Sequence, residues 1–175
     1  LDRRELSMVY QPIIRLKDGE LSGFEALMRW DHPKRGPIPP SEFIPIAEMS
    51  DLIGPLGMFA LDRATTDLMS WQRQTGELPL FLSVNLPSAQ LISADLYNDV
   101  RTLLQKTQIN PAQLKLELTE TMMMENPEQA RLVLARLKET GVGLALDDFG
   151  TGYSSLGQLT QFPFDTIKLD KSLVR

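Results

Sequence analysis

The 175-residue sequence has no cysteine and only one histidine. Without cysteine, disulfide scaffolds and thiolate metal sites are excluded, and a single histidine excludes His-rich zinc sites and disfavours Ser-His catalysis. Long hydrophobic runs are absent too, since every apolar stretch is far shorter than the roughly 20 residues of a membrane span. These absences predict a chain with no membrane segment of its own and fit a reducing compartment.

Positive charge is scarcer than negative charge, with 18 Lys and Arg against 23 Asp and Glu and a net charge of −5. An acidic chain without basic clusters argues against binding to duplex nucleic acid. Apolar residues make up 42% of the sequence, which predicts one packed core and a single domain over residues 1–175. The chain begins at Leu1 without an initiator Met, and both ends are expected to be cuts from a longer protein.

Short strand-like runs alternate with amphipathic helical stretches along the chain. Asp18-Gly19 joins the first two runs, Met8–Leu16 and Leu21–Trp30, and this dipeptide predicts an antiparallel hairpin. The proline-rich segment Pro33–Pro40 is expected to be a loop. Four further strands are expected at Leu80–Asn85, Leu114–Glu120, Gly143–Asp148 and Thr166–Asp170.

Helices are expected between the later strands. Ser41 and Ser93 are candidate N-caps for two of them, and Pro55–Thr75 is a third. Asn126 followed by Pro127 predicts the start of a fourth helix. A short fifth helix is expected over 154–161.

Helices between successive strands predict parallel pairing with right-handed crossovers. Two architectures satisfy that pattern, an open doubly wound sheet and a (β/α)₈ barrel. A complete barrel takes about 250 residues, or roughly 31 per unit. The chain therefore has room for about five or six units, which matches the six expected strands and leaves a barrel about two units short.

Polar side chains recur at the carboxyl ends of the expected strands, where barrel enzymes build their active sites. The set is Glu25, Asn85, Glu117, Glu120, Asp147, Asp148, Lys168 and Asp170. Each residue alone has a structural explanation, as a turn former, a strand end or a salt-bridge partner, but five strands repeating the arrangement favour a shared site. Carboxylate and amide oxygens are hard ligands that suit Mg²⁺, Mn²⁺ or Ca²⁺. Lys168 would pair with these acids, orient a water or stabilise a developing negative charge.

Several longer segments carry a family resemblance that runs nearly end to end. They are Tyr10–Ile13, Glu25–Trp30, His32–Pro33, Phe43–Glu48, Ser83–Leu86, Glu117–Glu120, Asp147–Leu156 and Lys168–Asp170. In these segments and in their order the chain resembles the EAL domain, a family of bacterial phosphodiesterases that hydrolyse cyclic di-GMP. The resemblance implies a modified TIM-like (β/α) barrel whose first strand is antiparallel. Since that family continues with two more βα units, it also implies a barrel that is incomplete after about six strands.

The resemblance further implies hydrolysis of cyclic di-GMP to linear pGpG by two Mg²⁺ or Mn²⁺ ions, with Ca²⁺ as an inhibitor. Asp148 would serve the second ion, and Asp170 matches an acidic position near the metals. The implied ligands of the metals are Glu25, Asn85, Glu117 and Asp147.

Other positions would act on the water and the substrate. Lys168 would position or activate the attacking water, and Glu120 would hold the loop that follows the strand at 143–148. Arg29 would contact a phosphate of the dinucleotide, while Gln11 and Leu27 would line its groove.

Alternatives to an enzyme stay open, because the barrel expected here lacks the family's last two strands. In the family those strands carry a further catalytic glutamate and a glutamine. One is a receptor that binds cyclic di-GMP without cleaving it, and another is a protein-interaction scaffold without nucleotide function. The resemblance also implies a homodimer formed through the loop after the strand at 143–148. It implies the cytoplasm as compartment, for the chain alone or as part of a larger, membrane-anchored signalling protein.

Overall fold

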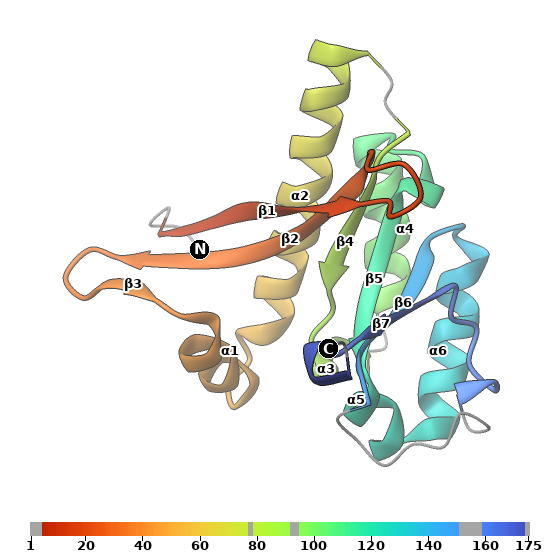
Figure 1. Cartoon of the computed structure of the whole chain (residues 1–175). Helices are drawn as coiled ribbons and strands as arrows, with labels where there is room; N and C mark the ends of the chain where they lie inside the picture. Colours follow the sequence, from red (N-terminus) through yellow and green to blue (C-terminus); the bar gives the residue numbers. More distant parts are fainter. Residues whose placement is uncertain (1–4, 77–78, 92–94, 151–158, 174–175) are drawn as a thin grey trace.

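A computed structural model describes residues 5–76, 79–91, 95–150 and 159–173 (Figure 1). Its centre is a sheet of seven strands. These are β1 (Leu6–Ile14), β2 (Leu21–His32), β3 (Gly36–Ile38), β4 (Phe81–Asn85), β5 (Leu114–Thr119), β6 (Gly143–Phe149) and β7 (Thr166–Leu169). The helices are α1 (Pro40–Glu48), α2 (Ile53–Thr75), α3 (Ser88–Leu91), α4 (Leu96–Thr107), α5 (Glu120–Glu125) and α6 (Pro127–Glu139), with 3₁₀ turns η1 (Pro111–Gln113) and η2 (Lys171–Leu173).

The strands are ordered β1-β2-β4-β5-β6-β7, with β3 paired to the far end of β2. The β1–β2 pair is antiparallel, as the Asp18-Gly19 signal predicts, and Gly19 takes the positive φ of +75° that this turn requires. The four pairs from β2–β4 to β6–β7 are parallel. The predicted hairpin and the predicted parallel crossovers are thus both confirmed.

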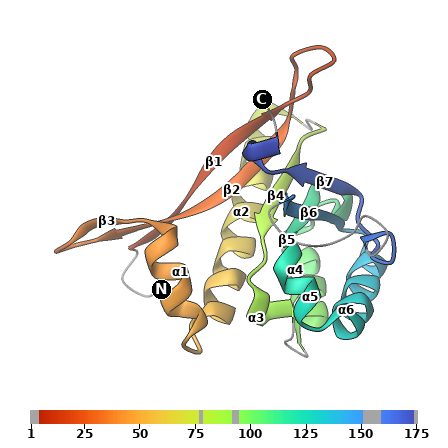
Figure 2. The ribbon, with the colours of Figure 1, turned by 60° about the horizontal axis from the view of Figure 1, so that its bottom comes forward.

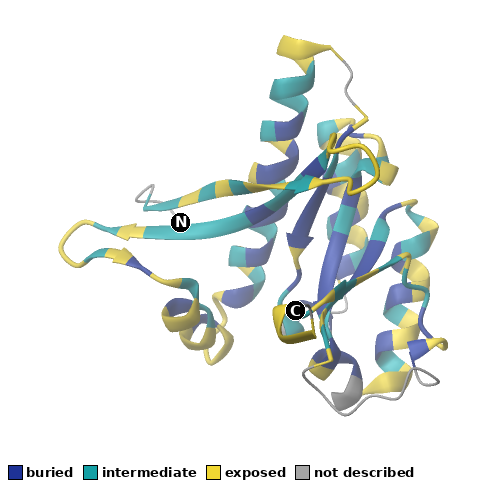
Figure 3. Cartoon of the chain, in the orientation of Figure 1, coloured by how far each residue is buried: buried dark blue, intermediate teal, exposed yellow. Residues whose placement is uncertain are grey.

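The core lies between one face of the sheet and the helices α2, α4 and α6 (Figures 1 and 2). Alternate residues of the central strands point into this layer and are fully buried, among them Leu82, Val84, Leu116 and Leu144. In Figure 3 the middle of each central strand is buried, with three consecutive buried residues in β4, β5 and β6. In a doubly wound sheet helices cover both faces, whereas in a barrel they cover only the outside. The helices of the described chain lie on one face, which favours the barrel.

Tyr10 ties the antiparallel hairpin to this helical layer. Its hydroxyl donates to Asp67 Oδ2 on α2 at 2.6 Å, and its ring meets Trp71 edge to face with centroids 4.7 Å apart. Burial, together with the hydrogen bond to the Asp67 carboxylate and its charge, raises the pKa of Tyr10 far above its ordinary value. The hydroxyl therefore stays a donor at any ordinary pH, and β1 is held against the helix that also covers β4.

Several elements in the first part of the chain begin or end one or two residues from the expected positions, and two further features differ from expectation. The predicted loop Pro33–Pro40 contains β3, because β2 extends to His32 and a turn at Gly36, with a φ of +74°, lets the chain pair back on it. The first helix begins at Pro40 after Pro39, so Ser41 lies inside it and is not its N-cap. Proline fills the first helical turn readily because that position has no hydrogen-bond partner for its N–H.

The later half of the chain differs at three places. The strand predicted over Leu114–Glu120 ends at Thr119, and Glu120 instead begins α5. The helix α3 follows β4 directly and was not predicted, while α4 begins at Leu96. Asn126 does cap α6, since its Oδ1 accepts from the Gln129 N–H at 3.3 Å.

Some expectations fall on parts of the chain that lie outside the described residues. These are the N-cap at Ser93, most of the helix predicted over 154–161 and most of the loop after β6. Within the described part, no helix combines the length and the apolar character needed to cross a membrane.

Candidate functional site

The register of the sheet places the predicted site residues on the face opposite the helices. Directly paired residues of neighbouring strands share a face. Asn85 on β4 pairs with Glu117 on β5, and Thr119, two residues further on, pairs with Asp147 on β6. Glu25 on β2 pairs with Ser83, which precedes Asn85 by two residues. Four neighbouring strands therefore direct polar side chains to the same side.

Three of these acids meet at one point. Glu25, Glu117 and Asp147 each offer a carboxylate oxygen, and the three oxygens lie within 4.8 Å of one another. The exposed fraction of their side chains is 20%, 0% and 17% respectively, so the cluster sits at the foot of the open face. Asn85 stands beside it and donates from Nδ2 to Glu25 Oε1 at 3.2 Å.

Lys168 on β7 contacts all three acids. Its Nζ lies 2.6 Å from Glu117 Oε2 and 3.2 Å from both Glu25 Oε2 and Asp147 Oδ1. Burial lowers the pKa of Lys168, but the hydrogen bond to Glu117 and the surrounding negative charges outweigh burial and raise it above its ordinary value. Lys168 is thus a fixed cation among three carboxylates.

Glu117 is the least satisfied member of the cluster. Burial raises the pKa of Glu117, and the hydrogen bond and charge of Lys168 oppose that rise without cancelling it. Its second oxygen, Oε1, is buried and accepts no hydrogen bond from the described residues. A buried acceptor without a partner is costly, and a cation bound between these acids would satisfy it.

The donor set fits a hard divalent cation. Three carboxylates and the amide of Asn85 supply only oxygen ligands, which Mg²⁺, Mn²⁺ and Ca²⁺ prefer over softer metals. The three carboxylates and Lys168 leave two negative charges uncompensated. The observed geometry and this charge would suit such a cation, and the metal-binding roles of these residues stay a prediction.

Asp148 and Asp170 lie near the cluster but outside its three-acid centre. Asp148 has a left-handed backbone, with a φ of +54°, where the β6–β7 register shifts, and its N–H donates to Asp147 Oδ1 at 3.0 Å. Its burial and the charges of Asp147 and Asp170 raise its pKa. Asp170 Oδ1 instead accepts from the Ser172 N–H at 2.8 Å, and this bonding to Ser172 lowers its pKa.

Glu120 occupies the first position of α5, immediately after the strand that carries Glu117. It is buried and belongs to α5 rather than to a strand of the sheet. The loop that Glu120 is predicted to hold lies largely outside the described residues, so this role stays a prediction.

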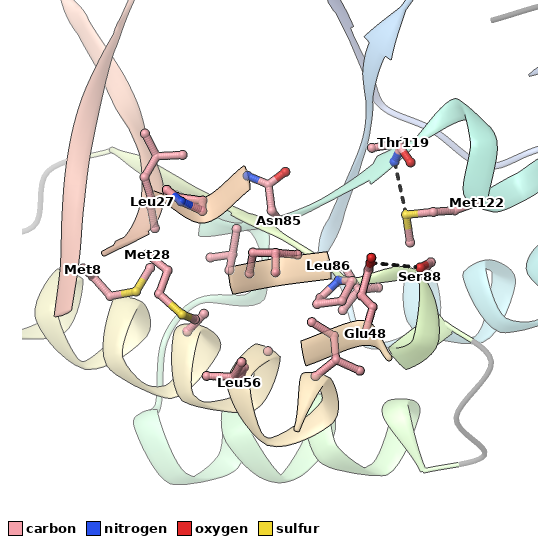
Figure 4. A pocket seen from close by; sticks show the side chains of 18 of the residues that line it. Met8, Leu27, Met28, Glu48, Leu56, Asn85, Leu86, Ser88, Thr119 and Met122 are labelled. Carbon is pink, nitrogen blue, oxygen red and sulfur yellow. Dashed lines mark hydrogen bonds between the residues drawn. The ribbon is translucent and has the colours of Figure 1, made fainter. Parts of the chain in front are cut away.

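A pocket of about 330 Å³ opens beside the cluster, between the middle of β2, the end of β4 and the helices α1 and α2 (Figure 4). Asn85 belongs to both, because it lines the pocket and bonds to Glu25. Leu27 and Arg29, two predicted substrate contacts, line it as well. Gln11 pairs with Glu25 across the hairpin and is exposed, but it is not among the residues that line this pocket.

Sequence reasoning assigned no role to several residues that line the pocket. Glu48 ends α1 and Ser88 begins α3, and the Ser88 hydroxyl donates to Glu48 Oε1 at 3.3 Å. Met122 lies in α5 and contributes to the wall. The sequence signal that could have identified Glu48 is its place in the segment Phe43–Glu48, which carries part of the family resemblance.

Comparisons with known proteins agree with these findings. The family model described as "EAL domain" matches residues 1–175. The cyclic di-GMP phosphodiesterase NbdA of Pseudomonas aeruginosa is 42% identical over 170 residues, which are 97% of this chain and 22% of that protein. A structure titled PaMucR phosphodiesterase, c-di-GMP complex, superposes with a TM-score of 0.92 at 38% identity, covering 98% of this chain and 69% of that one.

A third similar structure holds both a metal and the dinucleotide. The calcium and cyclic di-GMP complex of Klebsiella pneumoniae BlrP1 has a TM-score of 0.81 at 31% identity, covering all of this chain and 42% of that chain. These likenesses confirm the TIM-barrel-like fold. The chain spans about a fifth of the length of the first curated relatives that it matches.

Proposed function

This chain belongs to the EAL domain family, and from that premise we propose that it is a metal-dependent phosphodiesterase acting on cyclic di-GMP. The proposed reaction opens one phosphodiester bond of the cyclic dinucleotide and gives linear pGpG. The observation that carries the proposal is the meeting of Glu25, Glu117 and Asp147 within 4.8 Å at the edge of a ligand-sized pocket. The cyclic di-GMP phosphodiesterases among its relatives support the choice of substrate.

In this proposal the three carboxylates and Asn85 hold Mg²⁺ or Mn²⁺, and Asp148 and Asp170 extend the site to a second ion. When bound, such ions activate water and offset the charge that develops on the phosphodiester. Two observations support this assignment: Oε1 of Glu117 has no hydrogen-bond partner among the described residues, and the cluster carries two uncompensated negative charges. Ca²⁺ would bind the same oxygens and support ligand binding without turnover.

Lys168 is proposed to hold the attacking water on the side of the cluster. Its ammonium stays protonated, because the surrounding carboxylates raise its pKa, so it acts as a donor and a fixed charge rather than as a base. A positive group beside the reacting phosphate also stabilises charge in the transition state. Glu120 is proposed to support the loop after β6 from its buried position at the end of β5.

The substrate is proposed to lie across the open face. Arg29 lines the pocket two residues beyond Leu27 on β2. Its Nη1 donates to the Met28 carbonyl at 2.8 Å, which fixes the guanidinium near the rim. A guanidinium held there suits a phosphate oxygen. Leu27 would pack on the dinucleotide, and Gln11 would contact it from β1.

The experiment is chromatography of cyclic di-GMP after incubation with the purified chain and Mn²⁺. The proposal expects pGpG from the wild type and none from Glu25→Ala, which removes one of the three metal carboxylates. Glu20→Ala is the matched control, since Glu20 is an exposed acid just before the same strand, and it should keep full activity. Equal rates for Glu25→Ala and wild type would refute the metal assignment.

The same assay separates the enzyme from the receptor. Binding of cyclic di-GMP in Ca²⁺ with no product in Mn²⁺ would make these 175 residues a binding module. No binding and no product would leave only a role as an interaction scaffold. A homodimer formed near the loop after β6, and a place in the cytoplasm, complete the proposal on the family resemblance; light scattering tests the dimer.

A further inference from the structure

A thioether sulfur closes the turn from β5 into α5. The strand ends at Thr119, and the helix begins at the next residue, Glu120. Met122 lies three residues after Thr119, and its Sδ accepts the Thr119 N–H at 3.4 Å, as the dashed line in Figure 4 shows. In the usual form of this closure, the capping box, a Glu or Gln at the same position accepts that N–H. In this chain a sulfur therefore takes the place of a carboxylate or amide oxygen.

The Thr119 N–H lies between two acids of the candidate site. Glu117 precedes Thr119 by two residues on β5, so their side chains share the open face of the sheet. Thr119 pairs with Asp147, another acid of the cluster, on β6. Glu120 follows Thr119 directly and is buried. A shift of the backbone at Thr119 would therefore move Glu117 and Glu120 relative to Lys168.

The Met122 side chain also belongs to the pocket beside the cluster. It is only 9% exposed and lines the pocket together with Thr119. The wall of the pocket requires an apolar side chain at this position, whereas the turn requires a hydrogen-bond acceptor. Leucine would meet only the first requirement, and glutamine would meet only the second. A thioether, which is apolar and a weak acceptor, meets both.

We propose that Met122 is a positioning residue of the reaction, whose sulfur holds the Thr119 N–H and so keeps Glu117 and Glu120 in place at the cluster. This inference rests on the proposed function, because it concerns the hydrolysis of cyclic di-GMP. A residue that acts through the arrangement of the reacting groups changes kcat, whereas a change in the pocket wall alone changes KM. Substitution can therefore separate the acceptor from the wall.

The test compares Met122→Leu with Met122→Gln in steady-state hydrolysis of cyclic di-GMP with Mn²⁺. Met122→Leu keeps the apolar wall and removes the acceptor. Its kcat should fall about three- to tenfold, the range for one lost hydrogen bond, with KM within about twofold of the wild type. Met122→Gln returns an acceptor to the capping position, so its kcat should stay within about twofold of the wild type. Because its amide enters an apolar wall, its KM should rise about three- to tenfold.

Amide hydrogen exchange of Thr119, followed by NMR, tests the same contact without turnover. Exchange should be about three- to tenfold faster in Met122→Leu than in the wild type, because the N–H loses its acceptor. In Met122→Gln it should be as slow as in the wild type or slower.

Met123→Leu is the matched control. It makes the same substitution one residue further along α5, where the side chain is fully buried in the core and is not among the residues that line the pocket. It should keep the wild-type kcat, KM and Thr119 exchange.

A wild-type kcat or unchanged Thr119 exchange in Met122→Leu would overturn the inference and leave the proposed function standing. A kcat in Met122→Gln as low as in Met122→Leu would do the same. No product from the wild type would overturn the proposed function and, with it, the role of Met122 in the reaction. Thermal melts identify a variant that has lost its fold. If Met122→Leu is lost in this way, Met122→Gln decides alone: a wild-type kcat with slow Thr119 exchange supports the inference, and a reduced kcat or faster exchange overturns it.

Discussion

Lys168→Met tests whether the ammonium group balances the acids of the cluster. In the folded chain three carboxylates surround Lys168 Nζ at 2.6 to 3.2 Å. Removing one partner of a fully buried ion pair costs about 3–5 kcal/mol, because the other charge is left uncompensated. The side chains of Lys168, Glu25 and Asp147 are 26%, 20% and 17% exposed. Solvent screening therefore reduces the cost to about 2–3 kcal/mol.

A chain of this size loses about 2–4 °C in Tm for each kcal/mol. Lys168→Met should therefore melt about 4–12 °C below the wild type in EDTA, measured by circular dichroism. Saturating Ca²⁺ should raise the Tm of the variant by more than it raises that of the wild type, because the ion enters a cluster with no internal cation. The methionine has nearly the length of the lysine, so lost packing contributes little.

Lys138→Met is the control for this prediction. Lys138 pairs with Asp165 at 2.7 Å, and both side chains are more exposed, at 32% and 43%. An ion pair of that exposure is worth at most about 1 kcal/mol, and the response to Ca²⁺ should stay that of the wild type. The reasoning is wrong if Lys168→Met has the same Tm as the wild type in EDTA. It is also wrong if Ca²⁺ raises the Tm of Lys168→Met and of the wild type equally, because the ammonium then does not balance the cluster.

Two further predictions concern the scaffold. Tyr10→Phe removes the 2.6 Å hydrogen bond to Asp67 and should lower the free energy of unfolding by about 1–2 kcal/mol in urea titrations; an unchanged midpoint would show that the aromatic contact alone holds β1. For Asp165, burial raises the pKa, but the bonds from Lys138 and the Leu144 N–H outweigh it and the pKa is lowered. The stability that this carboxylate contributes is therefore present above its unfolded pKa of about 4 and is lost as the pH falls; Asp165→Asn should be less stable than wild type at pH 7 and equal to it near pH 2.

The pattern of polar residues was predictable because it depends on strand periodicity. Glu117 and Asp147 each follow a residue that is buried, and a strand with alternating character has only one face for its acids. The parallel order then brings the strand ends together. The sequence could not show the distances, since a metal centre needs specific side-chain rotamers as well as a shared face.

The errors arose where local signals were outweighed by tertiary contacts. Pro33–Pro40 is rich in proline and was predicted to be a loop, yet β3 pairs at the edge of the sheet, where proline is tolerated. Glu120 continues an apparent strand in sequence, but α5 begins there and Met123 is buried against the core. The pocket was missed for a related reason, because its wall combines α1, α2 and α3 with two strands, and no local pattern reports such a combination.

The same leucines that build the core also determine where the acids go. On β5, Leu116 and Leu118 are fully buried against the helices, and Glu117 lies between them on the other face. A slip of one residue would turn both leucines to the open face and place Glu117 in the apolar layer. Each part of that exchange is unfavourable, since it exposes apolar surface and buries a carboxylate away from Lys168. The register that maximises the core is therefore the register that assembles the cluster, and a single alternating pattern specifies both.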